Sequence, residues 1–256
     1  MIELFLWGWL IAAIGMVAMW SYQLKTSNAS HVDVAWAYGI GGLAIFYAFQ
    51  LQAMTASQWV VLGCILVWSL RLGTFLWRRT SGKPEDTRYS ELRKRWSQAK
   101  FFVFYQFQAL ATVLFSVPVL ISLQAMTFES LGSFHQMMGV AIAVISLLGE
   151  SLADRQLARF KEDRSHQGLT CRVGLWKYSR HPNYFFEWMF WFSFVAFAWG
   201  SSLWLMTWLG PVVMLILLFG ITGIPPSEAR ALESRGDDYR DYQSKTSVFI
   251  PWFPKS

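Results

Sequence analysis

The feature that most constrains this sequence is a series of long apolar runs that contain few or no charged residues. A helix needs about 20 consecutive apolar residues to cross the roughly 30 Å hydrocarbon core of a bilayer. Runs of that order lie at 2–22, 34–54, 59–77, 101–126, 135–152, 183–199 and 203–222. We therefore predict an all-α, multi-pass integral membrane protein with about seven transmembrane helices.

Composition agrees with a membrane protein and excludes several other classes. Apolar residues make up 54% of the 256 residues and charged residues only 15%, whereas a soluble domain carries about 25% charged residues. This apolar content is too high for a disordered chain, and the sequence has no glycine repeat of the kind that collagen requires. Two cysteines cannot build a disulfide framework, so we expect Cys64 and Cys171 to be reduced and unpaired.

The distribution of basic residues predicts the orientation of the chain. Segments 78–100, 153–182 and the tail from residue 223 hold eight, seven and five of the 22 basic residues. Because cytoplasmic loops carry such an excess of Lys and Arg, we expect the N-terminus outside and the C-terminus in the cytoplasm. The same rule, together with attraction to anionic membrane lipid, explains the net charge of +6 without a nucleic-acid partner.

The chain is predicted to form one membrane domain whose character changes near residue 150. Residues 1–149 hold plain spans, and residues 150–256 hold spans bordered by dense polar sequence, where we expect the chemistry. Glu150, Asp154 and Lys161 fall within about 40° of one another on a helix. They form either a stripe that faces a ligand or a solvated extension, although a carboxylate at membrane depth, such as Glu150, needs a partner.

A further helix is predicted to begin at Pro182, because proline suits the first helical turn, where its missing N–H is no loss. The start of that helix points free N–H groups and the positive end of its dipole toward the cytoplasmic boundary. Arg180 and His181 lie beside it, which makes this a favourable place for a phosphate.

Three polar side chains then share one face of the helix just inside the membrane, namely Asn183, Tyr184 and Glu187. The alternative is that Arg180 and His181 anchor lipid head groups, Tyr184 belongs to the aromatic belt and Glu187 pairs with an arginine. His181 has no second His or Cys at ligand spacing, so no metal site is predicted.

The C-terminal tail is predicted to hold a short helix closed by Gly236, followed by a second polar segment. The apolar residues of 249–253 would draw the chain end back to the membrane and fold Tyr239 and Tyr242 over whatever the earlier loops enclose. A solvated amphipathic tail is the alternative.

In the first half of the chain, Asp33 lies at the mouth of the second apolar run and either completes a capping box with Ser30 or takes part in chemistry. Segment 78–100 is either a lipid-facing basic loop or one wall of a site for an anionic ligand.

Four blocks of sequence, at 32–36, 82–93, 174–187 and 238–251, together resemble the steroid 5-alpha-reductase superfamily, specifically its bacterial membrane members of unassigned substrate. The resemblance covers nearly the whole chain. Sterol C14 reductases share the Arg-His-Pro-Asn-Tyr block found here at 180–184, and isoprenylcysteine carboxyl methyltransferases share it in looser form.

The resemblance implies a seven-helix reductase that holds NADPH on its cytoplasmic side and reduces a lipophilic, steroid-like enone entering from the bilayer. By position, it assigns the dinucleotide to Glu150, Asp154, Lys161, Arg172, Arg180, His181, Asn183, Tyr184, Glu187, Tyr239 and Tyr242. Asp33 falls where animal steroid reductases keep a Glu that faces the substrate carbonyl, and it is the catalytic candidate. The tyrosine that partners this Glu has no clear match, because its position falls near Trp68.

Hydride transfer to the β carbon of an enone builds negative charge on the carbonyl oxygen, and a donor aimed at that oxygen must meet it. A carboxyl group such as Asp33 would have to be protonated to serve. Two other functions stay open. An S-adenosylmethionine-dependent methyltransferase would bind a ligand without phosphate and would leave Lys161, Arg172 and Arg180 in excess, and a non-enzymatic lipid-binding protein would leave Asp33 and Glu187 without a task.

Overall fold

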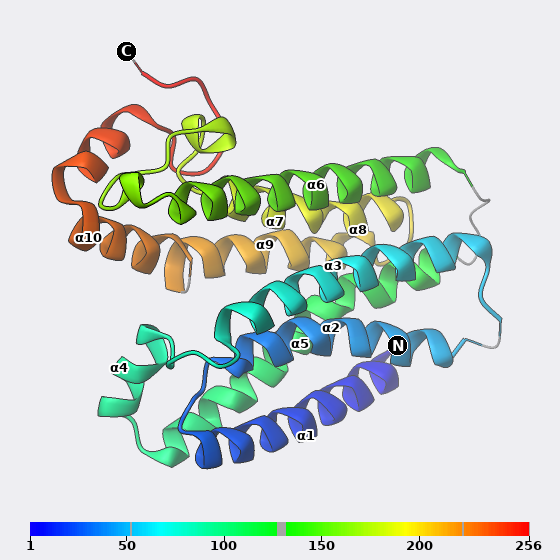
Figure 1. Cartoon of the computed structure of the whole chain (residues 1–256). Helices are drawn as coiled ribbons and strands as arrows, with labels where there is room; N and C mark the ends of the chain where they lie inside the picture. The colour runs from blue at the N-terminus through cyan, green and yellow to red at the C-terminus, as the bar shows by residue number, and fades with distance from the viewer. Residues whose placement is uncertain (52, 127–131, 222, 256) are drawn as a thin grey trace. The chain divides into compact units, whose positions relative to one another are not determined.

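The computed structural model describes residues 1–51, 53–126, 132–221 and 223–255. Every regular element in those ranges is helical, which confirms the predicted fold class (Figure 1). The main helices are α1 (Ile2–Thr26), α2 (His31–Phe49), α3 (Ala56–Thr80), α4 (Thr87–Arg95), α5 (Gln98–Ala125), α6 (Phe134–Glu162), α7 (Pro182–Phe190), α8 (Phe192–Phe197), α9 (Leu209–Ile216) and α10 (Ile224–Lys245). Short helical turns lie at η1 (Arg164–His166), η2 (Gly174–Lys177), η3 (Trp204–Trp208) and η4 (Leu217–Ile221).

Six helical stretches in the described residues are long and apolar enough to cross a membrane: α1, α2, α3, α5, α6 and the stretch Trp204–Lys245. The predicted run 183–199 is the exception, because it forms α7 and α8, which have nine and six residues. The two helices meet at Trp191, whose N–H bonds to the carbonyl of Trp188 three residues back and so tightens the turn. Residues 127–131 of a predicted loop and residue 222, the predicted end of the last run, lie outside the described ranges.

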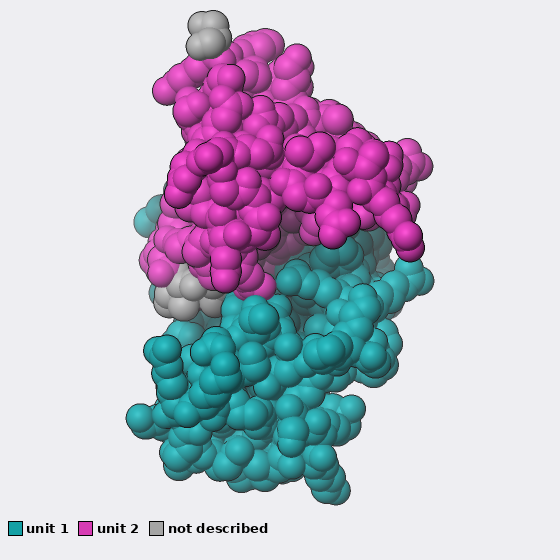
Figure 2. Space-filling model, turned by 60° about the vertical axis from the view of Figure 1, so that its left-hand side comes forward, with its two compact units in different colours: residues 1–136, 197–209 teal, residues 137–196, 210–256 magenta. Residues whose placement is uncertain are grey.

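The chain forms two compact units, coloured separately in Figure 2. Unit 1 contains residues 1–136 and 197–209, and unit 2 contains residues 137–196 and 210–256. Residue 150, where the sequence changes character, lies inside α6.

In unit 1, α2 packs against α1, α3 and α5. Small residues allow the close approach to α3, since a side chain at Gly73 would collide with the ring of Tyr38. Between α2 and α5, the hydroxyls of Tyr47 and Ser116 lie 2.8 Å apart in a buried hydrogen bond. Internal polar partners of this kind satisfy groups that lipid cannot.

In unit 2, α6 and α7 lie in direct contact, since a Cβ built at Gly149 of α6 would approach the ring of Phe186 in α7 to 2.5 Å. The C-terminal segment after α10 returns to the start of α7. The Ser179 hydroxyl donates to the carbonyl of Phe249 at 2.7 Å, and the Trp252 N–H donates to the carbonyl of Tyr178 at 2.9 Å.

Candidate functional site

The three residues of the predicted stripe all lie on one helix, α6. Glu150 is buried, Asp154 is half-buried, and Lys161 is in the last turn. The Asp154 carboxylate accepts a hydrogen bond from the Asn183 amide at 3.2 Å, which joins the stripe to α7. The stripe therefore packs against another helix over part of its length and is not simply a solvated extension.

Helix α7 begins at Pro182 with His181 at its N-cap, as predicted. The His181 ring is buried and stacks on Tyr184, with ring centroids 5.4 Å apart and an interplanar angle of 4°. The Tyr184 hydroxyl lies 3.2 Å from the hydroxyl of Ser227 in α10. The N-terminus of α7 is therefore held against α10 by side chains.

Two polar groups on α7 sit in buried surroundings. Glu187 is 7% exposed. The Nδ2 of Asn183 reaches Asp154, while its buried Oδ1 has no hydrogen-bond partner within the described residues. A buried acceptor without a donor is costly, and a ligand amide or hydroxyl would satisfy it.

Glu228, which the sequence pattern did not predict, is the centre of a hydrogen-bond network. Its Oε1 accepts hydrogen bonds from Nε of Arg180 at 2.6 Å and from the Tyr239 hydroxyl at 3.4 Å, and it lies 3.3 Å from Nε2 of His181. Its Oε2 accepts one from the Gln243 amide at 2.8 Å. Three of the predicted site residues thus converge on one carboxylate, which lies near the start of α10.

Arg172 is held by the second half of α10. Its guanidinium contacts Asp238 at 2.9 Å and Asp241 at 2.7 Å. Tyr242 is buried, and its hydroxyl donates to the backbone oxygens of Trp176 and Ser179. These contacts overturn the alternative of a solvated tail, because the tail supplies the partners of the 170–180 loop.

Gly236 explains how one helix supplies both groups of partners. Its φ of 51° and ψ of −120° interrupt the helical conformation inside α10, at the position where the sequence predicts a helix end. This positive φ is available to glycine at little cost and is strained for other residues. The chain bends there, so Glu228 and Asp238 lie on separately directed segments.

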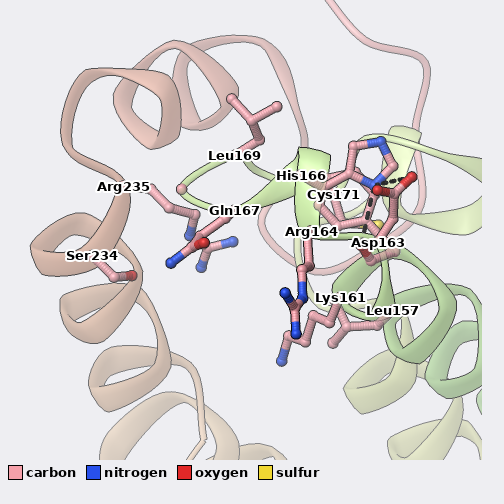
Figure 3. A pocket seen from close by; sticks show the side chains of 12 residues that line it. Leu157, Lys161, Asp163, Arg164, His166, Gln167, Leu169, Cys171, Ser234 and Arg235 are labelled. Atoms are coloured by element: carbon pink, nitrogen blue, oxygen red, sulfur yellow. Dashed lines mark hydrogen bonds and ion pairs between the residues drawn. The ribbon is translucent and has the colours of Figure 1, made fainter.

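A pocket of about 390 Å³ lies between the end of α6, the loop that follows it and α10. Figure 3 shows Ser234 and Arg235 of α10 on one side and Lys161 and Arg164 on the other. Of the predicted site residues, only Lys161 lines it. The sequence signal for this pocket is the concentration of basic residues in 153–182 and in the tail.

The pocket lining is strongly cationic, with Lys161, Arg164 and Arg235 against a single carboxylate, Asp163. Hydrogen bonds from the backbone and hydroxyl of Ser165 hold the pKa of Asp163 below its usual value. Arg235 lies over the Tyr239 ring at 4.9 Å, and neither it nor Arg164 has an ion-pair partner in the described ranges. The lining is therefore suited to an anion.

The thiol of Cys171 is buried in the wall of this pocket. Cys171 lines it but is only 2% exposed, and burial raises the pKa of its thiol. Both cysteines are free, as predicted.

The catalytic candidate Asp33 lies in unit 1, in a charged cluster with α4. Its Oδ1 accepts a hydrogen bond from the Tyr89 hydroxyl at 2.6 Å, and its Oδ2 contacts Arg88 at 3.0 Å. Burial, followed by the negative charge of Asp33, raises the pKa of Tyr89 well above its usual value. Tyr89 is therefore the hydroxyl donor of this cluster, and Asp33 is an acceptor.

The capping box, one of the two alternatives for Asp33, is not formed, because the Ser30 side chain makes no cap hydrogen bond. Its hydroxyl instead accepts from the backbone N–H of Asp86 at 2.8 Å. The basic segment 78–100 is not simply a lipid-facing loop either, since Arg88 and Arg93 pair with Asp33 and Glu85 inside unit 1.

Comparisons with known proteins match nearly the whole chain. The uncharacterized protein C594.04c of Schizosaccharomyces pombe is 26% identical over 280 residues, which cover 96% of this chain and 79% of the yeast protein. No solved structure matches. The family model described as "Protein of unknown function (DUF1295)" matches residues 19–246, a range that includes Asp33, Lys161, Glu228 and Arg235. The chain therefore belongs to the DUF1295 family.

Proposed function

We propose that this protein is an NADPH-dependent membrane oxidoreductase that reduces the carbon–carbon double bond of a lipophilic, steroid-like enone. The observation that carries the proposal is the cationic pocket lined by Lys161, Arg164 and Arg235. The resemblance of the 180–184 and 249–251 blocks to the steroid 5-alpha-reductase superfamily supplies the reaction class.

The charge of the pocket favours a phosphate-bearing cofactor. Arginine binds phosphate through paired, charge-assisted hydrogen bonds, and its planar fork suits that geometry. The sulfonium cofactor of a methyltransferase carries one carboxylate and no phosphate, so it brings fewer negative charges to two arginines and a lysine than NADPH does. The volume of about 390 Å³ lies within the usual range for small-molecule pockets of roughly 300–1,000 Å³.

The polar groups of α6 and α7 supply the complementary part of the site. No donor among the described residues reaches the buried carbonyl oxygen of Asn183, and Asp154 fixes the amide so that this oxygen keeps one orientation. An acceptor held in this way fits an amide or hydroxyl of a dinucleotide. Glu228 fixes Arg180 and His181 at the start of the same helix.

The chemistry needs a hydride on the β carbon of the enone and a proton on the α carbon. NADPH, when bound, supplies the hydride. We assign the stabilisation of the carbonyl oxygen to Tyr89, whose one hydroxyl proton is donated to Asp33 in this structure and would turn to the substrate oxygen when the enone binds. Asp33 holds the hydroxyl in place until then, and water supplies the proton for the α carbon. This assignment gives the donor role to a group that stays protonated at neutral pH, since burial raises the pKa of Tyr89.

The test is ligand-dependent thermal stability of the detergent-purified protein with NADPH, NADH and S-adenosylmethionine. Binding to the native state raises stability by mass action, and the 2′-phosphate of NADPH adds charge for the pocket to hold. We expect the largest shift with NADPH. Equal shifts with NADPH and NADH would contradict the phosphate assignment, and a shift with S-adenosylmethionine alone would replace the reductase with a methyltransferase.

Matched variants locate the effect. Arg164→Ala and Arg235→Ala remove a pocket cation and should each reduce the NADPH shift. Arg159→Ala removes a cation from an exposed position of the same helix as Lys161 but outside the pocket lining, and it should leave the shift unchanged. An equal loss in all three variants would mean that net charge, and not the pocket, attracts the nucleotide.

A further inference from the structure

A second cavity lies in unit 1, beside the start of α5. This groove of about 560 Å³ is lined by Trp96, Ala99, Lys100, Val103, Phe104 and Phe107. The lining residues from Ala99 onward lie one, three or four positions apart in the sequence, so they form one stripe along the start of α5. Val103 and Phe107 are 66% and 52% exposed, so the stripe is open.

The length of the stripe matches one leaflet of a membrane. The nine residues from Ala99 to Phe107 are separated by eight helical steps and rise about 12 Å, and half of a 30 Å hydrocarbon core is about 15 Å. Trp96 stands at one end and packs edge-on against Phe101 and Phe104, with centroids 5.7 and 5.9 Å away. Tryptophan is enriched at the membrane–water interface, so this end belongs at head-group level.

The charge at that end of the groove is positive. Lys100 lines the groove in the first turn of α5, and neither it nor Arg95 has an ion-pair partner among the residues the structure describes. The neighbouring Arg93 and Lys94 do have partners, Glu85 and Glu91. A cation in a first helical turn is also repelled by the positive end of the helix dipole. A negative group at Lys100 would relieve both problems.

We propose that this groove binds one acyl chain of an anionic phospholipid whose phosphate is held by Lys100. The apolar stripe fits the chain, and the cation at the interface end fits the head group. Anionic lipids concentrate in the cytoplasmic leaflet, where the basic segment 78–100 is predicted to lie. The proposal is independent of the cofactor and of the reaction.

Native mass spectrometry of the full-length protein tests it, with phosphatidylglycerol and phosphatidylcholine of identical chains offered together. We expect retention of phosphatidylglycerol over phosphatidylcholine. Lys100→Gln should weaken phosphatidylglycerol binding about fivefold, which is the fold-change that corresponds to about 1 kcal/mol for one basic residue at an anionic surface. Lys177→Gln, at an exposed position outside the groove, should leave it unchanged.

A second pair of variants tests the chain-binding part. Val103→Trp fills the groove and should reduce the retention of both lipids, whereas Val144→Trp adds the same bulk at a 46% exposed position on α6 and should not. If Val103→Trp does not fold, Phe107→Ser removes the deep end of the stripe, with the same expected loss.

Four outcomes would overturn the proposal, of which the first three concern the lipids, the variants and the oligomeric state. Those three are equal retention of the two lipids by the wild-type protein, equal effects of Val103→Trp and Val144→Trp, and a groove-dependent dimer, which would make a second copy of the chain the occupant. A steroid enone that binds the groove in competition with both lipids, without a head-group preference, would identify it as a substrate site instead.

Discussion

The charged cluster around Asp33 and the pocket beside Arg235 use the same residue types but balance their charges differently. In unit 1, Arg88 and Arg93 each meet a carboxylate, Asp33 and Glu85, within 3.0 Å. In unit 2, the pocket is lined by Arg164 and Arg235, neither of which has an ion-pair partner in the described residues, and by one carboxylate, Asp163, which accepts hydrogen bonds from Ser165. Charges that are balanced internally hold a fold together, whereas an excess of one sign is available to a ligand.

The largest expected effect tests whether the balanced cluster is only structural. Asp33→Ala leaves the Tyr89 hydroxyl without its acceptor and should lower enone-dependent NADPH oxidation about 10²–10³-fold, the usual loss when a preorganised donor is disturbed. Asp33→Asn keeps an acceptor, so its rate of NADPH oxidation should lie between those of the wild type and Asp33→Ala. NADPH affinity should stay nearly constant. Wild-type turnover by Asp33→Ala on any accepted enone would return the cluster to a purely structural role.

The next effect concerns Glu228, the balanced part of unit 2. Glu228→Ala removes the common partner of Arg180, His181 and Tyr239 and should lower the free energy of unfolding by about 3 kcal/mol, as when one member of a buried pair is lost. Asp237 pairs with Arg240 on the surface, so Asp237→Ala is the control and should change thermal stability little. Equal losses in the two variants would show that Glu228 is no more than a surface partner.

A crossed pair of arginine variants sharpens the comparison. Arg235→Ala should weaken NADPH binding about tenfold, the value of one charge-assisted contact, and change stability little. Arg88→Ala should do the opposite, because it removes the guanidinium that contacts Asp33 at 3.0 Å and Asp86 at 3.1 Å. Nucleotide titration and thermal unfolding of both variants give the answer. Loss of affinity in Arg88→Ala together with unchanged stability would reverse the roles assigned to the two regions.

The smallest expected effect is a pH dependence in unit 1. Because the pKa of Tyr89 is raised in the folded protein, the unfolded chain loses this proton first, above its usual value of 10.0. Stability should therefore fall above about pH 10, by at most about 1.4 kcal/mol per pH unit from this group. Thermal midpoints between pH 8 and 11 should fall less steeply for Tyr89→Phe than for the wild type. Identical slopes would mean that Tyr89 titrates normally.

Local chemistry predicted part of this architecture well. The start of α7 follows from the fixed φ of Pro182, and the interruption of α10 follows from Gly236. Both features depend on a single residue and its own backbone. The length of each apolar run likewise predicted the long helices, except that the run 183–199 is divided into two short helices at Trp191.

What sequence reasoning could not reach depends on partners that are distant in the chain. Glu228 lies 48 positions after Arg180, and nothing in its own neighbourhood indicates that it is the centre of a network. Ser30 has the spacing of a capping box, but a backbone N–H from Asp86, 56 positions later, takes its hydroxyl. Tyr89 is similar, since only the folding of α4 onto α2 makes it the partner of Asp33.

The contacts that Gln243 and Phe249 make with the loop before α7 also determine when that loop can fold. The acceptors of Arg180 and Ser179 belong to Gln243 and Phe249, which are 63 and 70 positions later. A ribosome adds about 5–20 residues per second, so the loop before α7 waits for roughly 3–14 s after its own synthesis. A message that stops before codon 249 yields a chain that cannot close this region. The start of α7 therefore acquires these partners only after residues 243 and 249 have been made.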